Sequence, residues 1–477
     1  MSRSSARADL AWGYLAQALN LGAGVLLLPV VVRFLPPAQV GLWFVFLTLG
    51  ALAQLLEFGF QPTLARNMAY AYAGASNLQA QGVPQAPDAG SSPNLALAAQ
   101  LQDAAQFIYR WVAIAAAGVL ALGGGSYLMT LVPPAQAQEV LWAWALYGAG
   151  QVWNFYYGYL NGLMQGRGDV AAANKVVIVA RLAMLLSSVA ALVAGAGLVG
   201  LGVASFLSCL VGRLVALRLY RRGAPAPQPV SSRERREILR VLWPNASRLG
   251  LVQLGAFLIQ RANVLIASSV MGVAAAASFG LTATLLTMLS GVSSVVLQLR
   301  IPRLAAAQAA RDMPSLRGLF GEVVLLALGV FGLGLGVLLC FGDNMLKLVH
   351  SQTPLLPPTL VALLGLVTLL ELNHSIAAGY LTTRNRVPFL AASLISGAGI
   401  ATLSLLWVGP WGALGLIAAQ GLVQGAYNNW KWPRAARVEL QASWAEILIL
   451  GVRKLLGRTR SAPVSSDSGI PNDRERK

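Results

Sequence analysis

Residues 10–60 read LAWGYLAQALNLGAGVLLLPVVVRFLPPAQVGLWFVFLTLGALAQLLEFGF. Two apolar runs, 10–33 and 39–60, flank a short Pro-containing break, and each is close to the roughly 20 residues that an α-helix needs to cross a bilayer. We therefore expect an all-α integral membrane protein with about 12 transmembrane helices. The remaining predicted spans are 105–132, 139–162, 174–195, 198–220, 244–269, 273–299, 317–341, 355–380, 387–409 and 411–432.

The distribution of basic residues predicts the orientation of the chain. Of its 35 Lys and Arg residues, 30 fall in segments on one side of the predicted topology, with large groups from Arg213 to Arg240 and after Pro433. The positive-inside rule places this side, with both termini, in the cytoplasm. Three further cations, Arg181, Arg248 and Arg261, fall within predicted spans.

Composition excludes several classes of function. The chain is 56% hydrophobic and 11% charged, and its net charge of +18 is expected to face anionic lipid headgroups, so we predict membrane lipids and no nucleic acid as partners. Two Cys and two His residues favour neither a disulfide framework nor a metal site. No Lys follows a Gly, so the Gly-Lys-Ser/Thr sequence of a P-loop is missing. The sequence also offers no Ser/His/Asp set that could form a catalytic site. We expect no catalytic residues, no cofactor, no metal and no enzyme activity.

An internal repeat divides the chain. Residues 162–170 (GLMQGRGDV) match residues 379–387 (GYLTTRNRV) in Gly, Arg and Val at equal offsets, and each segment has a Leu one or two residues after its first Gly. Six spans in each half predict two six-helix lobes related by a pseudo-twofold axis along the membrane normal. The predicted units are an N-terminal lobe, a basic cytoplasmic linker, a C-terminal lobe, and a cytoplasmic amphipathic helix with a disordered tail. Their bounds are 1–222, 223–237, 238–432 and 433–477.

Polar residues recur on the first and seventh predicted spans. Such groups are costly at bilayer depth, so they usually face protein or a wet cavity. Interhelical hydrogen bonds and a hydrated cavity both fit the amides, whereas Arg261 lies too far from the interface to snorkel and favours a cavity. The positions are Gln17, Asn20 and Gly24 on the first span, and Gln253, Gln260, Arg261 and Asn263 on the seventh.

The predicted cavity would suit an anionic, sugar-bearing ligand. Arg261 and Arg181 could pair with phosphate oxygens, although Arg181 could also snorkel to the headgroups. The fourth span carries a dense run of rings and amides, including Asn154 and Tyr157, which fits either sugar binding or helix packing.

Carboxylates also occur within the predicted spans. Glu371 and His374 lie three residues apart on one helix face, so a proton relay and structural hydrogen bonding are both open, and they are candidates for ion coupling. Glu57 and Glu322 are expected to be solvated or paired with Arg66 and Arg317.

Several segments resemble a known family. Gly13–Asn20, Leu28–Val30, Val40–Trp43 and Glu57–Arg66 resemble polysaccharide biosynthesis proteins of the O-antigen flippase type, which move lipid-linked oligosaccharides. Residues 159–167 (YLNGLMQGR) are similar to members of the multidrug/oligosaccharidyl-lipid/polysaccharide exporter superfamily.

This resemblance implies an alternating-access transporter whose central cavity is lined by the first, second, seventh and eighth spans. Such proteins flip undecaprenyl-pyrophosphate-linked oligosaccharide from the cytoplasmic to the periplasmic leaflet of the bacterial inner membrane, commonly coupled to an ion gradient. A polysaccharide polymerase or export complex is a further candidate partner. The alternatives are an ion-coupled multidrug exporter of the same superfamily, a membrane glycosyltransferase or ligase acting on lipid-linked sugars, and a scaffold without activity of its own.

Overall fold

The computed structural model describes residues 3–79, 92–224, 229–382 and 389–457, and these ranges are built from helices without a strand. The first half contains α1 (Arg3–Phe34), α2 (Pro37–Gln54), η1 (Leu55–Glu57), α3 (Phe60–Tyr72), α4 (Leu95–Gly118), η2 (Val119–Gly124), α5 (Gly125–Leu131), α6 (Pro134–Tyr156), α7 (Tyr159–Arg167), α8 (Val170–Val193) and α9 (Gly197–Arg221). The second half contains α10 (Ser232–Gln260), α11 (Ala262–Val270), α12 (Val273–Ala309), α13 (Met313–Leu348), α14 (Pro358–Thr382), α15 (Leu390–Trp411), α16 (Ala413–Ala426), α17 (Asn428–Leu440) and α18 (Trp444–Leu455).

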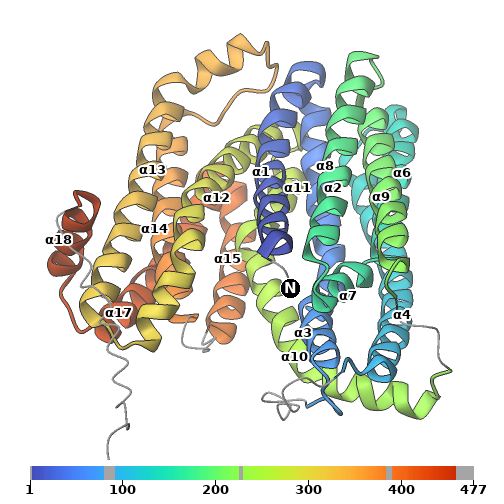
Figure 1. Ribbon diagram of the computed structural model, residues 1–477. Coiled ribbons are helices and arrows are strands. Elements are labelled where there is room, and N and C mark those ends of the chain that lie inside the picture. Colours follow the sequence, from blue (N-terminus) through green and yellow to red (C-terminus); the bar gives the residue numbers. More distant parts are fainter. Residues whose placement is uncertain (1–2, 80–91, 225–228, 383–388, 458–477) are drawn as a thin grey trace, which may run out of the picture.

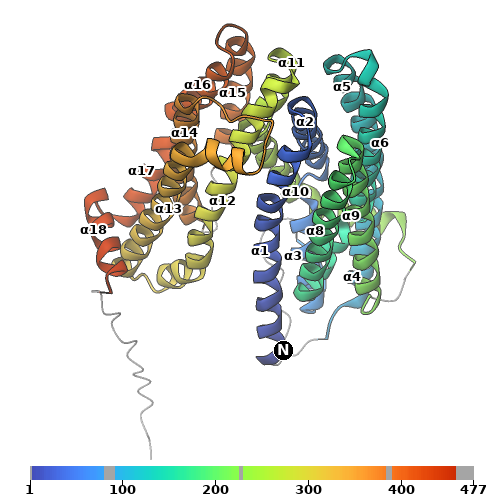
Figure 2. The ribbon, with the colours of Figure 1, turned by 90° about the horizontal axis from the view of Figure 1, so that it is seen from above.

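The helices form two lobes, as predicted. Helices α13 to α18 lie on one side, and α4, α6, α8 and α9 lie on the other (Figures 1 and 2). Within the first lobe α1 packs on α8, α6 on α9 and α8 on α9. The equivalent helices of the second lobe pair in the same way, with α10 on α15, α14 on α17 and α15 on α16. The repeated pairing is what two structurally equivalent six-span bundles require.

The described residues contain fewer long apolar helices than the predicted spans, because α6 is rich in polar residues and α16 is only 14 residues long. Nine described helices are long and apolar enough to cross a membrane, and the bent pair α10–α11 makes up to ten. The two predicted spans that fall short are α6–α7 and α16–α17, and both are broken into two helices. The second span also breaks, because Phe58 and Gly59 take left-handed backbone angles between η1 and α3.

Side-chain caps set several helix starts. Ser231 and Glu234 form a capping box, so α10 begins at Ser232 and part of the predicted linker is helical. Similarly, Asn94 caps α4, which begins ten residues before the predicted span 105–132. Asp312 accepts the Ser315 backbone N–H at 3.0 Å, and hydrogen bonds from Ser315 hold the pKa of Asp312 below its usual range.

Helix α18 packs on α13 at the edge of the second lobe (Figure 1). Gly321 and Gly451 allow the two backbones to approach closely, and Ile447 is fully buried. Arg317 reaches Glu446 at 3.1 Å, so its predicted pairing with Glu322 is wrong. Glu322 pairs with Arg300 at 2.5 Å instead. The predicted tail beyond residue 457 lies outside the described residues.

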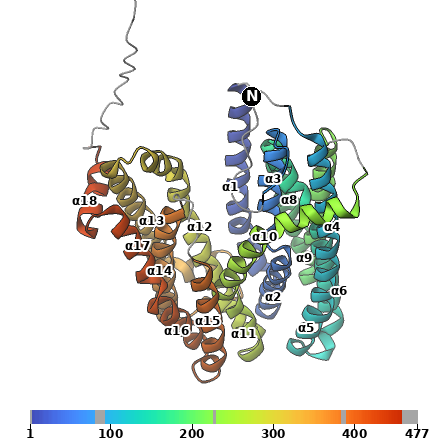
Figure 3. The same ribbon diagram turned by 90° about the horizontal axis from the view of Figure 1, so that it is seen from below.

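Two sets of contacts join the lobes. At one end α2 packs on α11 and α12, and at the other α10 crosses to α3 and α4 (Figure 3). The end where α3 stops and α10 starts carries Arg167, Arg222 and Arg311, and we call it the basic end. The α2–α12 contact, at the opposite end, is close because Gly41 lies against the carbonyl of Val273.

Replacing Gly41 by Ala is expected to destabilise the protein. The added Cβ would overlap the Val273 carbonyl oxygen, and such overpacking costs about 1–3 kcal/mol. Thermal unfolding of the purified protein in detergent measures the loss. The matched control is Gly118→Ala on α4, where a Cβ meets nothing within 4 Å. Equal melting temperatures for the two variants would contradict the close contact.

Candidate functional site

A polar cavity of about 350 Å³ lies within the first lobe, and we call it the N-lobe cavity. Its walls come from α2, α6, α7, α8 and α9. Its polar lining includes two guanidinium groups together with amides, hydroxyls and a thiol. These residues are Gln54, Tyr147, Gln151, Asn154, Asn161, Arg181, Ser205, Ser208, Cys209 and Arg213.

Arg213 is held inside the lobe. Its Nε donates to Asn154 Oδ1 at 2.9 Å and its Nη1 donates to Asn161 Oδ1 at 3.0 Å. The residue is 8% exposed, so its place among the loop cations in the sequence analysis is wrong. Two amide oxygens partly replace the lost hydration of the guanidinium, because a buried charge needs hydrogen-bond partners.

Close packing of α6, α8 and α9 holds these groups in place. A Cβ on Gly212, beside Arg213, would lie 2.9 Å from Ala180 Cβ, and one on Gly150 would lie 2.9 Å from Phe206 Cα. Ser208 Oγ donates to the Ala180 carbonyl at 2.8 Å. Small residues at helix interfaces let backbones approach, so the three helices form a rigid frame.

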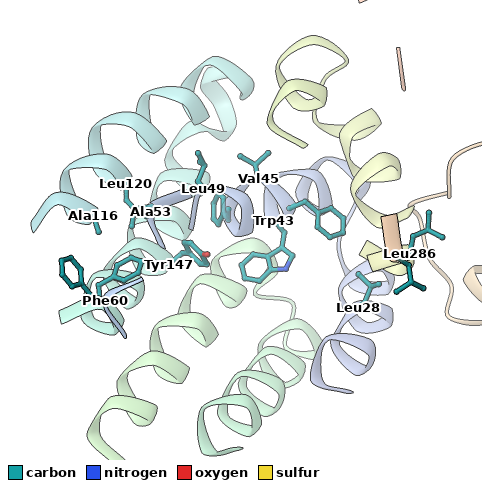
Figure 4. Packing of buried hydrophobic residues seen from close by; sticks show 14 of the residues in the cluster. Leu28, Trp43, Val45, Leu49, Ala53, Phe60, Ala116, Leu120, Tyr147 and Leu286 are labelled. Carbon is teal, nitrogen blue, oxygen red and sulfur yellow. The ribbon is translucent and has the colours of Figure 1, made fainter. Parts of the chain in front are cut away.

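Aromatic rings close one side of the N-lobe cavity. Tyr147 packs edge-on against Trp43 at 5.9 Å and stacks on Trp144 at 5.5 Å (Figure 4). Its hydroxyl lies against Gly50 of α2, where no side chain would fit. The side of the cavity that α2 and α6 form is therefore fixed by the packing of these rings.

Arg181 joins the N-lobe cavity to the space between the lobes. It lines this cavity and also an interlobe pocket of about 180 Å³, together with Gly24, Thr284 and Met288. Arg181 is exposed. Among the described residues, no carboxylate lies in salt-bridge contact with Arg181 or Arg213.

Glu57 follows the cavity residue Gln54 closely in the sequence, and its carboxylate has a hydrogen-bond partner of its own. Its Oε1 accepts a hydrogen bond from Tyr109 Oη at 2.5 Å, so the predicted pairing with Arg66 is wrong. Glu57 lies within electrostatic range of Arg213 without forming a salt bridge to it, so it offsets only part of the charge that Arg213 brings to the cavity.

The polar stripe of α1 faces the other lobe. A Cβ on Gly24 would lie 2.9 Å from Met288 Cε of α12, so the face of α1 that contains Gly24 points at the second lobe. Asn20 and Gln17 occupy the same face one and two turns nearer the basic end. Both are exposed.

The equivalent helix, α10, carries the matching stripe. Gln260 lines a cavity of the second lobe, and Gln253 lies two turns away on the same face and is exposed. The chain bends by 41° between α10 and α11, and Arg261 is the residue at the bend. Arg261 is exposed and lies within electrostatic range of Tyr147 on the first lobe.

The cavity that Gln260 lines has a volume of about 100 Å³, and we call it the C-lobe cavity. It contains Glu371, whose Oε1 accepts from Gln420 Nε2 at 2.8 Å and Gln424 Nε2 at 3.1 Å. Asn263 lines the same cavity and accepts from Ser404 Oγ at 2.9 Å, while its Nδ2 is buried without a hydrogen-bond partner. The titratable groups that line the two cavities thus differ, with guanidinium groups in the first lobe and a carboxyl group in the second.

Two predicted site residues lie apart from these cavities. His374 Nδ1 bonds Asn429 Oδ1 at 2.8 Å and does not line the C-lobe cavity beside Glu371. Tyr157 lines a separate pocket at the basic end, whereas Asn154 lines the N-lobe cavity. Among the described residues, no group of three His, Cys, Asp or Glu side chains is placed to hold a metal ion.

No protein-family model and no curated protein sequence matches the chain. Solved structures do match. One is an inward-facing conformation of a multidrug resistance MATE family transporter of the MOP superfamily, with a TM-score of 0.65, 15% identity, and coverage of 89% of this chain and 95% of that chain. The chain shares this transporter's fold.

Two further structures have the same fold. The lipid II flippase MurJ in an inward closed conformation has a TM-score of 0.63 at 8% identity, over 94% of this chain and 90% of that chain. The MATE multidrug transporter DinF-BH, solved as a complex, has a TM-score of 0.57 at 14% identity, over 93% of this chain and 96% of that chain. The predicted all-α membrane fold with two helical lobes is therefore confirmed.

Cys209 offers a direct test of the charge in the N-lobe cavity. In a Cys340→Ser background it is the single thiol, and it lines the cavity with Arg181 and Arg213. Each reagent's labelling rate at Cys209 is divided by its rate with a simple thiol in solution. We expect this relative rate to be about tenfold higher for an anionic, sulfonate-bearing thiosulfonate reagent than for a cationic, ammonium-bearing one. Labelling rates followed by mass spectrometry give the ratio.

Arg181→Gln with Arg213→Gln should abolish this preference. Arg218→Gln with Arg222→Gln, which removes two exposed charges at the basic end, is the matched control. A preference that survives loss of the cavity pair would show that the charge at Cys209 has another source.

Proposed function

We propose that the protein is an alternating-access transporter that flips an undecaprenyl-pyrophosphate-linked oligosaccharide, such as an O-antigen or exopolysaccharide repeat unit, between the leaflets of the bacterial inner membrane. The observation that carries the proposal is the pair Arg181 and Arg213 in a cavity of about 350 Å³, with no described carboxylate in salt-bridge contact. A guanidinium recognises phosphate in a planar, bidentate manner. A pyrophosphate headgroup supplies the charge that these groups lack.

The neighbouring lining suits the sugar part of the cargo. Gln54, Gln151 and Asn154 bring amide donors and acceptors to the same cavity as the two guanidiniums. Amides can bond sugar hydroxyls, and ring faces such as that of Tyr147 can pack on a pyranose. Together they offer sites for a charged group and a polyhydroxylated group in one space.

The path into the N-lobe cavity is the face between the lobes. Asn20, Gln17 and Gln253 form exposed polar stripes on α1 and α10, and Arg181 stands where the interlobe pocket meets the cavity. We propose that the headgroup follows these stripes while the lipid tail stays in the bilayer. Arg261, exposed at the α10–α11 bend, would contact the headgroup from the second lobe.

Breaks and contacts between the lobes provide the elements that would move. The lobes meet at Gly41 and Val273 at one end, and at Phe58 and Gly250 nearer the other. Phe58 lies at the break between η1 and α3, where a few residues can absorb backbone rotation. Rocking of the lobes about these contacts would expose the cavity to each side in turn.

We propose that the basic end, with both termini, faces the cytoplasm. We take the predicted lobe bounds, 1–222 and 238–432, as working limits for the two moving bodies. A polysaccharide polymerase or export complex remains a candidate partner at the opposite end.

Transport of lipid-linked oligosaccharide should depend on the two cavity cations. After depletion of the native protein, an impermeant sugar-modifying probe applied from the periplasm measures the outward-facing fraction. Wild type should restore outward labelling, whereas Arg181→Gln with Arg213→Gln should restore about a tenth or less, because each lost charge-assisted contact costs about 1.5–3 kcal/mol.

The control for this assay is Arg218→Gln with Arg222→Gln, which should restore labelling fully. Normal outward labelling in depleted cells would contradict the flippase proposal. Unpolymerised units outside would then favour an enzyme or scaffold.

We propose that Glu371 couples transport to a cation or proton. One of its oxygens is held by two glutamines, and the carboxylate lines the C-lobe cavity. His374, bonded to Asn429, is the second predicted coupling residue and lies outside that cavity.

Glu371→Gln is expected to abolish gradient-driven transport and to leave exchange of cargo without a gradient. The glutamine oxygen can still accept from Gln420, so the helices stay packed, but the negative charge is lost. Proteoliposomes with and without imposed proton and sodium gradients separate the two activities. Glu237→Gln, an exposed change at the basic end, is the control. Retained gradient dependence in Glu371→Gln would disprove this role.

An ion-coupled multidrug exporter is the second candidate, and Glu371 favours it. A carboxylate in a cavity suits an organic cation, and two of the proteins with this fold are multidrug transporters. On this alternative, depletion would raise sensitivity to cationic dyes and leave the leaflet distribution of lipid-linked oligosaccharide unchanged.

A further inference from the structure

Two pockets follow one another along the seam between α4 and α6 on the first lobe. The first, at the basic end, has a volume of about 480 Å³ and contains Arg110 and Arg221 with several tyrosines. The second has a volume of about 900 Å³ and is lined mainly by Ala, Gly, Leu and Trp residues. Both are lined by the first lobe alone, from α4 to the residues just after α9.

The two pockets occupy the same faces of α4 and α6. On α4 the stripe runs from Gln106 and Arg110 in the basic pocket to Ala117 and Ala121 in the apolar pocket, at helical spacing. On α6 it runs from Tyr156 to Val152, one turn apart. A single elongated ligand can therefore reach from one pocket into the other.

The basic pocket is built to receive an anion. Arg110 and Arg221 are exposed, and no described carboxylate lies in salt-bridge contact with either. By contrast, Arg235, which lies nearby over Phe107, is neutralised by Asp103 at 2.6 Å. Tyr156 and Tyr157 pack edge-to-face at 4.8 Å and supply hydroxyl groups beside the two guanidiniums.

The apolar pocket is kept open by small residues. The π-helical turn η2 runs directly into Gly125, and a Cβ on Gly125 or Gly148 would meet nothing within 4 Å. Trp144 Nε1 donates to the Leu120 carbonyl at 3.0 Å, which satisfies a backbone group at the π turn. Exposed apolar residues such as Trp142 and Leu122 flank the groove. This surface is suited to hydrocarbon chains.

We propose that the α4–α6 seam binds an anionic phospholipid of the bilayer, with its phosphate headgroup at Arg110 and Arg221 and its acyl chains along the apolar groove. Basic pockets between transmembrane helices on the cytoplasmic side recognise anionic headgroups in this way. Helices α4 and α6 lie at the outer side of the first lobe, away from α1 (Figure 2). A resident lipid therefore fits it better than the transported cargo does.

Native mass spectrometry and thermal unfolding of the full chain, titrated with phosphatidylglycerol or phosphatidylcholine, test the site. Phosphatidylglycerol should bind with higher affinity and raise the melting temperature further. Arg110→Gln with Arg221→Gln should lower its affinity about tenfold. Gly148→Leu should also lower it, because a Cβ at this position meets nothing within 4 Å and the rest of the new side chain would take up space in the groove.

Arg218→Gln with Arg222→Gln is the control for charge at the same end and should change affinity by less than about twofold. The proposal is overturned if this control weakens binding as much as the pocket pair, or if phosphatidylcholine binds equally well. It is also overturned if Gly148→Leu has no effect, or if inorganic phosphate alone stabilises the protein as phosphatidylglycerol does.

Discussion

The burial of the Arg213 guanidinium between α6, α7 and α9 is the constraint on which the arrangement of the first lobe depends. A cation away from water needs acceptors, and here Asn154 and Asn161 supply them at 2.9 and 3.0 Å. Both residues must therefore face α9, and glycines must bring the helices close enough. The same frame turns Arg181 toward the space between the lobes and creates a cationic cavity at bilayer depth.

The second lobe repeats the helix pairing of the first, but its cavity carries a carboxyl group in place of guanidinium groups. Glu371, held by Gln420 and Gln424, stands in the C-lobe cavity where the first lobe has cations in its own. On our proposal, one duplicated architecture offers one site for an anion and another for a cation. In a transporter whose lobes rock against each other, such a division permits cargo and coupling ion to act on separate bundles.

The sequence predicted the membrane class, the two lobes and the polar stripes, because charge asymmetry, span length and the cost of buried polar groups are local properties. It missed Arg213, which lies one to two turns before a cluster of interfacial arginines and looks like one of them. Its partners are 59 and 52 residues away, and only packing reveals them. The partners of Glu57 and Glu322 were missed for the same reason. The roles proposed for Arg261, Arg181 and Glu371 remain predictions.

The central claim is that the anionic headgroup is held by the cations of the N-lobe cavity. A cryo-electron microscopy structure of the full chain with undecaprenyl-pyrophosphate-linked oligosaccharide tests it most directly. The account predicts pyrophosphate density within hydrogen-bond distance of Arg181 or Arg213, with sugar density beside Gln151 and Asn154. Headgroup density confined to the C-lobe cavity, or to a surface remote from both guanidiniums, would contradict it.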